Sequence, residues 1–407
     1  MNAMDQLIFC LPHAPAFTFD WAGLRALPPL EEWFYRMEKT PQNPEWHGEG
    51  DVWTHTRMVC DALAALPEFR SMEESARNVL ALAALLHDIG KVPCTKLEEG
   101  KWVAPHHGPV GAQVARGLLW RDFGLSGDPA KQRFREAVCL LIRYHTQPLH
   151  LIEGEQPAVR VMKLAANGEL APDFTLKALC LLSEADALGR IAPDVPELLE
   201  TIALSRELAQ ENECLNGPYA FASACTQRAL FSGAKVWRDQ ELYDDAWGEV
   251  ILMCGLPGTG KDTWIRKNYP DWPTVCLDDI RRELGVKPED NQGRVAQAAK
   301  EKARGYLRSR QPFIWNATSL TSLRAQQIEL FESYHARTRI VYLETEWKEN
   351  MRRNAGRADA VPQSVIENML DKLEPPERWE ARQVDWICMK KNNDEKEMQA
   401  GEKDHDR

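Results

Sequence analysis

Apolar residues recur at helical spacing in the first half of the chain and in short runs in the second half. From Asp51 to about Gln210, successive stretches carry apolar positions three and four residues apart, which is typical of amphipathic helices. We expect these helices at residues 54–66, 72–86, 111–119, 134–144 and 175–187. Strand-like runs are scarce in this half, so the pattern predicts an all-α N-terminal domain.

After Glu249 the pattern alternates between β-rich runs and helical stretches. The runs lie at 250–254, 274–277, 311–315 and 338–343, with helical stretches at 292–310 and 322–335 among the segments between them. Such alternation predicts βαβ units and a parallel sheet flanked by helices. The predicted fold class is therefore α + α/β. We expect a helical domain at 1–210, a linker with a connecting helix at 211–248, an α/β domain at 249–391 and a disordered charged tail at 392–407.

Composition and charge narrow the class of protein. The 407 residues include 44% hydrophobic and 27% charged residues, which is ordinary for a globular protein. No apolar run approaches the roughly 20 residues of a membrane span, and the N-terminus has no secretory pattern. Ten scattered cysteines without a Cys-x-x-Cys pair fit reduced thiols, so we expect a cytoplasmic protein without a membrane partner.

The net charge of −11 argues against bulk attraction to a polyanion. The charge is uneven, since residues 1–248 carry −11 whereas residues 249–391 carry +3. If the protein handles nucleic acid, we expect local cationic clefts, more readily in the C-terminal half.

A glycine-rich segment, GLPGTGKDT at residues 255–263, follows the apolar run EVILMC and precedes a helical stretch. Strand, glycine turn and helix together are the context of a phosphate-binding loop, in which backbone N–H groups and a lysine surround an anion. The alternative is a glycine turn that only caps a helix. We expect the nucleotide-binding residues to be Gly255, Gly258, Thr259, Gly260, Lys261, Asp262 and Thr263.

One position departs from that motif. Asp262 stands where Ser or Thr normally offers a hydroxyl to Mg²⁺, and Thr263 follows one place late. A carboxylate also binds Mg²⁺, but it adds negative charge beside the phosphates. We therefore expect altered metal and nucleotide affinity without a change of fold.

Histidines and aspartates at the ends of apolar helices form the candidate metal site. His87 and Asp88 follow the run LALAALL, so a rigid helix would present an imidazole and a carboxylate side by side. His55 and Asp186 are candidates to complete the site from other helices. Any single histidine of this kind is more often a structural residue than a ligand, and the adjacent pair is what favours a metal.

In order and type, His55, His87-Asp88 and Asp186 resemble the H…HD…D signature of the HD-domain metal phosphohydrolases, over roughly residues 30–200. The resemblance implies that these four residues are core ligands for one or two divalent transition metal ions. His107 and His145 resemble the histidines that hold a second metal in some members, with His106 as a competitor of His107. Lys91 resembles the family's basic residue near the substrate phosphate.

The stretch WHGEGDVWTH at residues 46–55 is also similar to HD domains attached to bacterial CCA-adding enzymes, which act on RNA 2′,3′ ends. The alternative to an active site is a degenerate HD scaffold kept for structure.

Downstream of the glycine loop, two carboxylates lie at the end of an expected strand, in CLDDIR at residues 276–281. We interpret Asp278 as a base beside the γ-phosphate and Asp279 as the cap of a helix that begins near residue 280. Further on, the arginines of RRNAGR at 352–357 are placed to close over a transferring phosphoryl group. The alternative is a surface helix that carries arginines without a role in phosphoryl transfer. Asn316 follows another strand and is a candidate to contact phosphate or to support the base.

These segments resemble, in order, the 5′-OH polynucleotide kinases over residues 249–380. The resemblance implies that Asp278 is the general base and that Arg281 contacts the acceptor phosphate. Arg353 and Arg357 match the family's lid arginines, and Lys261 its phosphate-contacting lysine. ATP or another NTP with Mg²⁺ would be the cofactor.

The two halves together are similar to the bifunctional bacterial HD-domain polynucleotide kinase end-healing enzymes. The resemblance implies RNA repair: removal of a 2′,3′-cyclic phosphate or 2′-phosphate, phosphorylation of a 5′-OH end of RNA or DNA, and an RNA ligase acting in sequence. Two alternatives stay open. One is a nucleotide phosphohydrolase fused to a small-metabolite kinase, and the other is a catalytically impaired, nucleotide-gated RNA-binding module.

Overall fold

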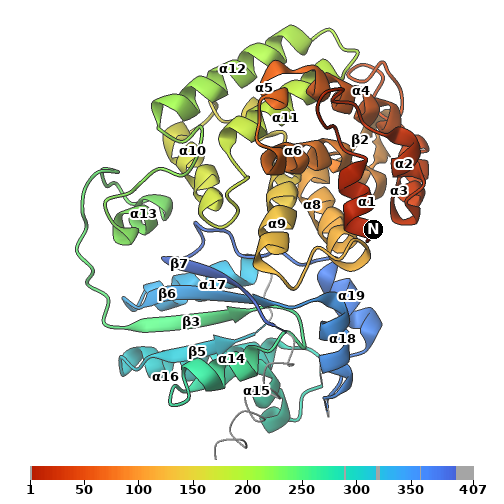
Figure 1. Cartoon of the computed structure of the whole chain (residues 1–407). Coiled ribbons are helices and arrows are strands. Elements are labelled where there is room, and N and C mark those ends of the chain that lie inside the picture. Colours follow the sequence, from red (N-terminus) through yellow and green to blue (C-terminus); the bar gives the residue numbers. More distant parts are fainter. Residues whose placement is uncertain (1, 288–289, 318–320, 358, 391–407) are drawn as a thin grey trace, which may run out of the picture.

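The computed structural model describes residues 2–287, 290–317, 321–357 and 359–390 of the chain. The disordered tail predicted at 392–407 lies outside the described residues. A helical half is followed by an α/β half, and the two lie against each other (Figure 1). The predicted fold class is confirmed. In the described residues, no helix is long and apolar enough to cross a membrane.

The helical half begins with twelve α-helices in the described residues, and all five expected helices are among them. They are α1 (Ala3–Phe9), α2 (Trp21–Arg25), α3 (Pro28–Glu38), α4 (Val52–Ala65), α5 (Pro67–Arg70), α6 (Glu74–Leu86), α7 (Lys91–Cys94), α8 (His107–Gly117), α9 (Pro129–Tyr144), α10 (Pro157–Ala166), α11 (Leu176–Leu188) and α12 (Val195–Glu211). Shorter helical turns are η1 (Leu118–Asp122), η2 (Gln147–Leu149) and η3 (Asn167–Glu169).

Helix α6 is the centre of this half, because the part VLALAALL of its sequence ESARNVLALAALL is apolar on every side. Ten of its residues are buried, and it packs against α4, α9 and α11. A helix that is apolar all round is stable only inside a core. Its C-terminal end therefore delivers the next two residues, His87 and Asp88, into the interior, where both are at most 1% exposed.

The expectation of a purely helical N-terminal domain is wrong in one place. Residues Lys96–Glu98 (β1) and Lys101–Val103 (β2) form an antiparallel hairpin between α7 and α8. Each strand is only three residues long and mostly exposed, so neither leaves an alternating apolar pattern in the sequence. The turn is made by Glu99 and Gly100, both with positive φ.

The predicted connecting segment contains one helix, α13 (Ala224–Phe231), and leads into a five-stranded parallel sheet. The strands are β3 (Glu249–Cys254), β4 (Thr274–Cys276), β5 (Phe313–Asn316), β6 (Arg337–Glu344) and β7 (Gln383–Cys388), in the spatial order β4-β5-β3-β6-β7. The four expected strands are present. Strand β7 was not expected, because only its second residue, Val384, is buried and no apolar alternation results.

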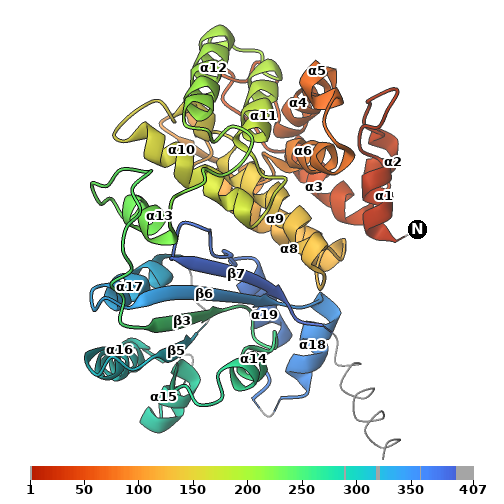
Figure 2. The ribbon, with the colours of Figure 1, turned by 60° about the vertical axis from the view of Figure 1, so that its left-hand side comes forward.

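Alternate residues of β3 point to opposite faces of the sheet. Val250 and Leu252 pack on one face with residues of α16 (Gly293–Arg308), α17 (Thr321–Glu332) and α19 (Gln363–Leu370). Ile251 and Met253 pack on the other face, against α14 (Lys261–Asn268). Helices α15 (Leu277–Leu284) and α18 (Trp347–Ala355) complete this half. Figure 2 shows this layered arrangement beneath the helical half.

The interface between the halves contains a buried ionic cluster. Arg135 on α9 contacts Glu344 at the end of β6, with Nη2 and Oε2 2.6 Å apart, and neither side chain is exposed. Glu136 bridges Arg135 to Arg116 on α8, and the Arg135 guanidinium lies 4.2 Å from the centre of the Trp120 ring. The two halves are thus joined through paired charges, consistent with α8 and α9 lying over β7 and α19 in both views (Figures 1 and 2).

Candidate metal centre and phosphate-binding loop

Six side chains that the sequence proposes as metal ligands converge inside the helical half. His55 comes from α4 and Asp186 from α11, whereas His87, Asp88 and His145 follow the ends of α6 and α9, and His107 begins α8. His55 Nε2 lies 3.0 Å from Asp186 Oδ1 and 3.6 Å from Asp88 Oδ2. On the other side of Asp88, Oδ1 lies 3.6 Å from His107 Nε2 and 3.9 Å from His145 Nε2.

Asp88 is therefore shared by two ligand groups. One consists of His55, His87 and Asp88, and the other of Asp88, His107 and His145, with the ligand atoms of each group within 4.8 Å of one another. His106, the competitor of His107, is exposed and precedes α8 in a left-handed conformation, so the structure does not bring it into the cluster.

Backbone carbonyls orient three of the imidazoles. The Nδ1 atoms of His87, His107 and His145 lie 2.8, 2.9 and 2.8 Å from carbonyl oxygens three residues earlier in the chain. Such contacts place the proton on Nδ1 and leave the lone pair of Nε2 available to bind a metal ion. The orientation of each ring is thus set by the backbone at the end of the helix where the residue lies.

The donor set fits a divalent transition metal. Within the described residues, His87 Nε2 and Asp88 Oδ1 are buried and have no hydrogen-bond partner, although burial of such groups without a partner is costly. Burial, with the neighbouring imidazoles of His107 and His87, lowers the pKa of His145 to about 3, which keeps this residue neutral. Imidazole nitrogen with carboxylate oxygen suits zinc, iron, nickel and similar ions.

Lys91 lies at the rim of this cluster, with Nζ 2.7 Å from Asp88 Oδ2 and 2.7 Å from Gln42 Oε1. Burial alone would raise the pKa of Asp88, but the Lys91 ammonium and the imidazoles around it hold that pKa well below its usual range. The carboxylate is therefore ionised and able to act as a ligand.

Two further residues belong to the site and were not predicted as ligands. Glu49 Oε1 lies 2.9 Å from His55 Nδ1 and 2.8 Å from His47 Nδ1, and its other oxygen accepts the N–H of Ile191 at 2.9 Å. Burial opposes ionisation, yet the contacts with His47 and His55 hold the pKa of Glu49 below its usual value. The motif HGEGDVWTH contained the signal, because it places Glu49 six residues before His55 in a loop that folds back on α4.

The glycine loop connects β3 to α14, and its conformation requires glycine at three positions. Gly255, Gly258 and Gly260 have φ values of 136°, 85° and 96°. A Cβ on Gly255 would lie 2.3 Å from the carbonyl oxygen of Leu343 on β6, so this position is also sterically closed to larger residues. Thr259 is 1% exposed and its hydroxyl donates to the Leu256 carbonyl at 2.9 Å, so it stabilises the loop itself.

Lys261 folds back over this loop. Its Nζ donates to the carbonyls of Gly255 and Leu256 at 2.8 and 3.0 Å. Burial lowers the pKa of Lys261 to about 8, and the charges of Asp262, Arg357 and Asp278 also act on it. Lys261 thus lies within electrostatic reach of three other residues proposed from the sequence.

Asp262 has a specific partner. Its Oδ1 accepts a hydrogen bond from Asn316 Nδ2 at 2.8 Å, and Asn316 is the last residue of β5. Thr263 is exposed, and among the described residues its side chain has a hydrogen-bond contact only with Arg266, at 3.5 Å. Asn316 therefore holds the carboxylate that replaces the usual hydroxyl.

Asp278 lies in the first turn of α15, directly after β4, and its side chain is 65% exposed. Its carboxylate accepts from Arg281, which also contacts Gln292 at 3.3 Å. The assignment of Asp279 as a helix cap is wrong. Helix α15 begins at Leu277 without a side-chain cap, and Asp279 pairs with Arg282 instead.

The arginine segment lies where the helix-and-loop prediction placed it. Arg353 is on α18, contacts Glu349 at 2.8 Å and donates to the Lys390 carbonyl at 2.6 Å. A Cβ on Gly260 would lie 3.5 Å from Arg353 Nη1, so this guanidinium borders the loop. Arg357 follows the end of α18 and is exposed. Asn350, on the same helix, was not predicted; its buried amide abuts Gly258 and has no hydrogen-bond partner among the described residues.

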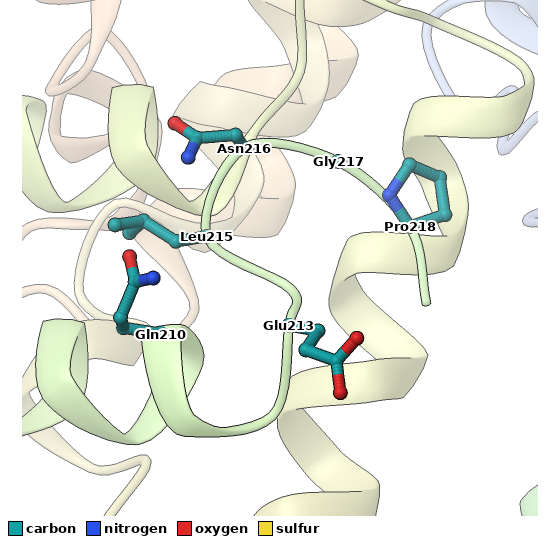
Figure 3. A pocket seen from close by; sticks show the side chains of 6 residues that line it. All are labelled: Gln210, Glu213, Leu215, Asn216, Gly217 and Pro218. Carbon is teal, nitrogen blue, oxygen red and sulfur yellow. The ribbon is translucent and has the colours of Figure 1, made fainter. Parts of the chain in front are cut away.

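An open pocket lies apart from these residues, at the turn after α12 (Figure 3). It is lined by Gln210, Glu213, Leu215, Asn216, Gly217 and Pro218. None of these residues belongs to either proposed site.

Comparison with known proteins finds a family match within each half. Residues 51–191 match the HD domain family, and residues 250–376 match the AAA domain family. The chain is thus an HD domain followed by a P-loop domain whose five-stranded parallel sheet is flanked by helices.

The chain is also similar to the multifunctional CCA protein of Hahella chejuensis, with 29% identity over 151 residues. The match spans 37% of this chain and 32% of that protein, so the chain covers about a third of the relative's length.

Proposed function

We propose that the protein is an end-healing enzyme for RNA or DNA. The HD half would remove a 2′,3′-cyclic phosphate or a 2′-phosphate, and the P-loop half would transfer a phosphoryl group from ATP or another NTP to a 5′-OH. The observation that supports this most is that Asp278 and Arg357 lie within electrostatic reach of Lys261, in a chain whose other half brings six histidine and aspartate side chains together. An RNA ligase would act next on the healed ends.

In the HD half, His55, His87, Asp88 and Asp186 would hold one divalent ion, and His107 and His145 would share Asp88 with a second. Ions bound there would supply a Lewis acid for a phosphoryl oxygen and would lower the pKa of a bound water. Lys91, fixed beside Asp88, binds the phosphate oxygens at the rim of the cluster. Glu49 holds the His55 ring through Nδ1, so that Nε2 stays directed into the cluster.

In the P-loop half, the backbone N–H groups of the loop and Lys261 bind the nucleotide phosphates. Mg²⁺ would be held at Asp262 and would neutralise part of the phosphate charge. Asp278 takes the proton of the 5′-OH while the hydroxyl oxygen attacks the γ-phosphorus, and the nucleoside diphosphate leaves. Arg281 holds the Asp278 carboxylate and, at the acceptor, an adjacent phosphate. Arg353 and Arg357 stabilise the charge that spreads over the transferring group.

End-group analysis of one RNA that carries both a 5′-OH and a 2′,3′-cyclic phosphate tests the proposal. We expect the wild type to change both ends, His87→Ala to change only the 5′ end, and Asp278→Ala to change only the 3′ end. Each variant serves as the folding control of the other, because each should retain one activity. Loss of both activities in each variant, or of neither, contradicts two separate sites. Hydrolysis and phosphorylation of mononucleotides or small metabolites alone would favour a phosphohydrolase–metabolite kinase fusion instead.

A further inference from the structure

Two surface segments, residues 41–51 and the β1–β2 hairpin, are flanked by residues that contact the histidine cluster. The segment 41–51 leads into α4, and Gln42 accepts a hydrogen bond from Lys91 at 2.7 Å. Its middle is tied to the turn after α11, because the Gly48 N–H donates to the Ile191 carbonyl at 2.9 Å. The β1–β2 hairpin lies between Lys91 and His107, which approach Asp88 at 2.7 and 3.6 Å. Both segments are therefore anchored at residues of the same site.

An ion pair joins these two segments to each other. Lys101 Nζ on β2 lies 3.0 Å from Glu45 Oε2. The next residue after each partner is a tryptophan, and both tryptophans are exposed: Trp46 to 40% and Trp102 to 37%. Leu97 pairs with Trp102 across the hairpin and is 59% exposed. Large apolar side chains are thus exposed on both segments that adjoin the cluster.

These segments offer flat apolar rings rather than free positive charge. Both hairpin lysines are already paired, Lys96 with Glu98 at 2.7 Å and Lys101 with Glu45. Single exposed apolar residues are common on protein surfaces, but here two exposed tryptophans lie on segments that the Lys101–Glu45 ion pair holds together. Aromatic side chains of this kind stack on nucleobases of any sequence, because each base has a π-face.

We propose that Trp46 and Trp102 stack on the nucleobases that precede the terminal phosphate, so that the HD half acts on the end of a single-stranded polynucleotide rather than on a mononucleotide. The inference rests on the proposed phosphoesterase function of the histidine cluster. Stacking at the rim selects a chain, since a mononucleotide that reaches the cluster has no preceding bases for the tryptophans to hold.

Steady-state kinetics on two substrates test this proposal. The substrates are a short RNA ending in a 2′,3′-cyclic phosphate and a 2′,3′-cyclic mononucleotide. For Trp46→Ala and Trp102→Ala we expect KM for the RNA to rise on the order of tenfold, equivalent to ~1.4 kcal/mol, with kcat unchanged. The mononucleotide kinetics should stay within about twofold, and Trp46→Phe should restore most of the RNA affinity because a ring face remains. Trp237→Ala, at a tryptophan that is 82% exposed in the linker, is the matched control.

Direct binding separates this inference from the proposed reaction. Fluorescence anisotropy measures the binding of a labelled RNA with a 3′-terminal phosphate. The affinity should fall on the order of tenfold in either alanine variant but not in Trp237→Ala. The loss of RNA affinity with rising salt should also be far smaller than the ~1000-fold loss typical of six or more phosphate contacts. Weakened binding without turnover by the wild type would refute the reaction and support the stacking surface. Unchanged RNA binding, or equal effects on both substrates, would overturn the stacking surface.

Discussion

Glu344→Gln should destabilise the protein strongly, because it removes one charge from the buried cluster between the halves. The cluster balances the guanidiniums of Arg116 and Arg135 against the carboxylates of Glu136 and Glu344, all at most 5% exposed. Glutamine keeps the shape and one acceptor oxygen but leaves an excess positive charge. Removing one partner of a buried ion pair costs about 3–5 kcal/mol, and we expect the lower end, ~3 kcal/mol, because an acceptor remains. That is a large share of the roughly 5–15 kcal/mol by which proteins are stable.

Urea unfolding followed by tryptophan fluorescence measures this effect, with linear extrapolation of the free energy of unfolding. Glu301→Gln is the matched control, since Glu301 pairs with Arg304 on the surface of α16 and is 50% exposed. An exposed pair contributes at most ~1 kcal/mol. A loss in Glu344→Gln no larger than in Glu301→Gln would refute the argument. The double change Arg135→Met with Glu344→Leu should recover most of the stability, because neither residue then leaves an unpaired charge.

Three further predictions concern the metal site, the phosphate loop and its supporting helix. Removal of metal with a chelator should lower the melting temperature of the wild type but not of His87→Ala, measured by thermal unfolding alongside metal analysis; equal shifts would contradict ligation by His87. Asp262→Ser should leave the fold intact and change the metal dependence of ATP use, measured as activity across Mg²⁺ and Mn²⁺ concentrations, and an unchanged profile would show that this position does not face the metal. Contacts with Arg352 and Arg353 lower the pKa of Glu349 from 4.5 to about 2. Because the folded-state pKa is lowered, this stabilisation is present above pH 4.5 and lost as the pH falls toward 2. The loss of unfolding free energy in Glu349→Gln should thus be constant from pH 8 to 5 and shrink below 4.5, and a pH-independent difference would count against the ion pair.

The helices were predictable because each carries a local signal that tertiary packing reinforces. Helix α9 begins five residues before its predicted start because Asp128 caps it, accepting the N–H groups of Ala130 and Lys131, and Pro129 occupies its first turn. The apolar pattern alone starts later. The β1–β2 hairpin and β7 left no such signal, because few of their side chains are buried and the choice of partner strand depends on distant residues.

The order of residue types along the chain already indicates an apolar helix ending in His87-Asp88 and a glycine loop whose positive φ values no other residue adopts easily. It also supported the α + α/β fold class, because hydrophobic period is a local property. Which side chains meet follows instead from the packing of the folded chain. Asp88 shared between two histidine groups, Glu49 behind His55, Asn316 holding Asp262, and Arg135 reaching Glu344 all join residues on separate elements. Such contacts depend on how rigid helices and strands pack in three dimensions, and the spacing of residues along one chain does not encode that distance.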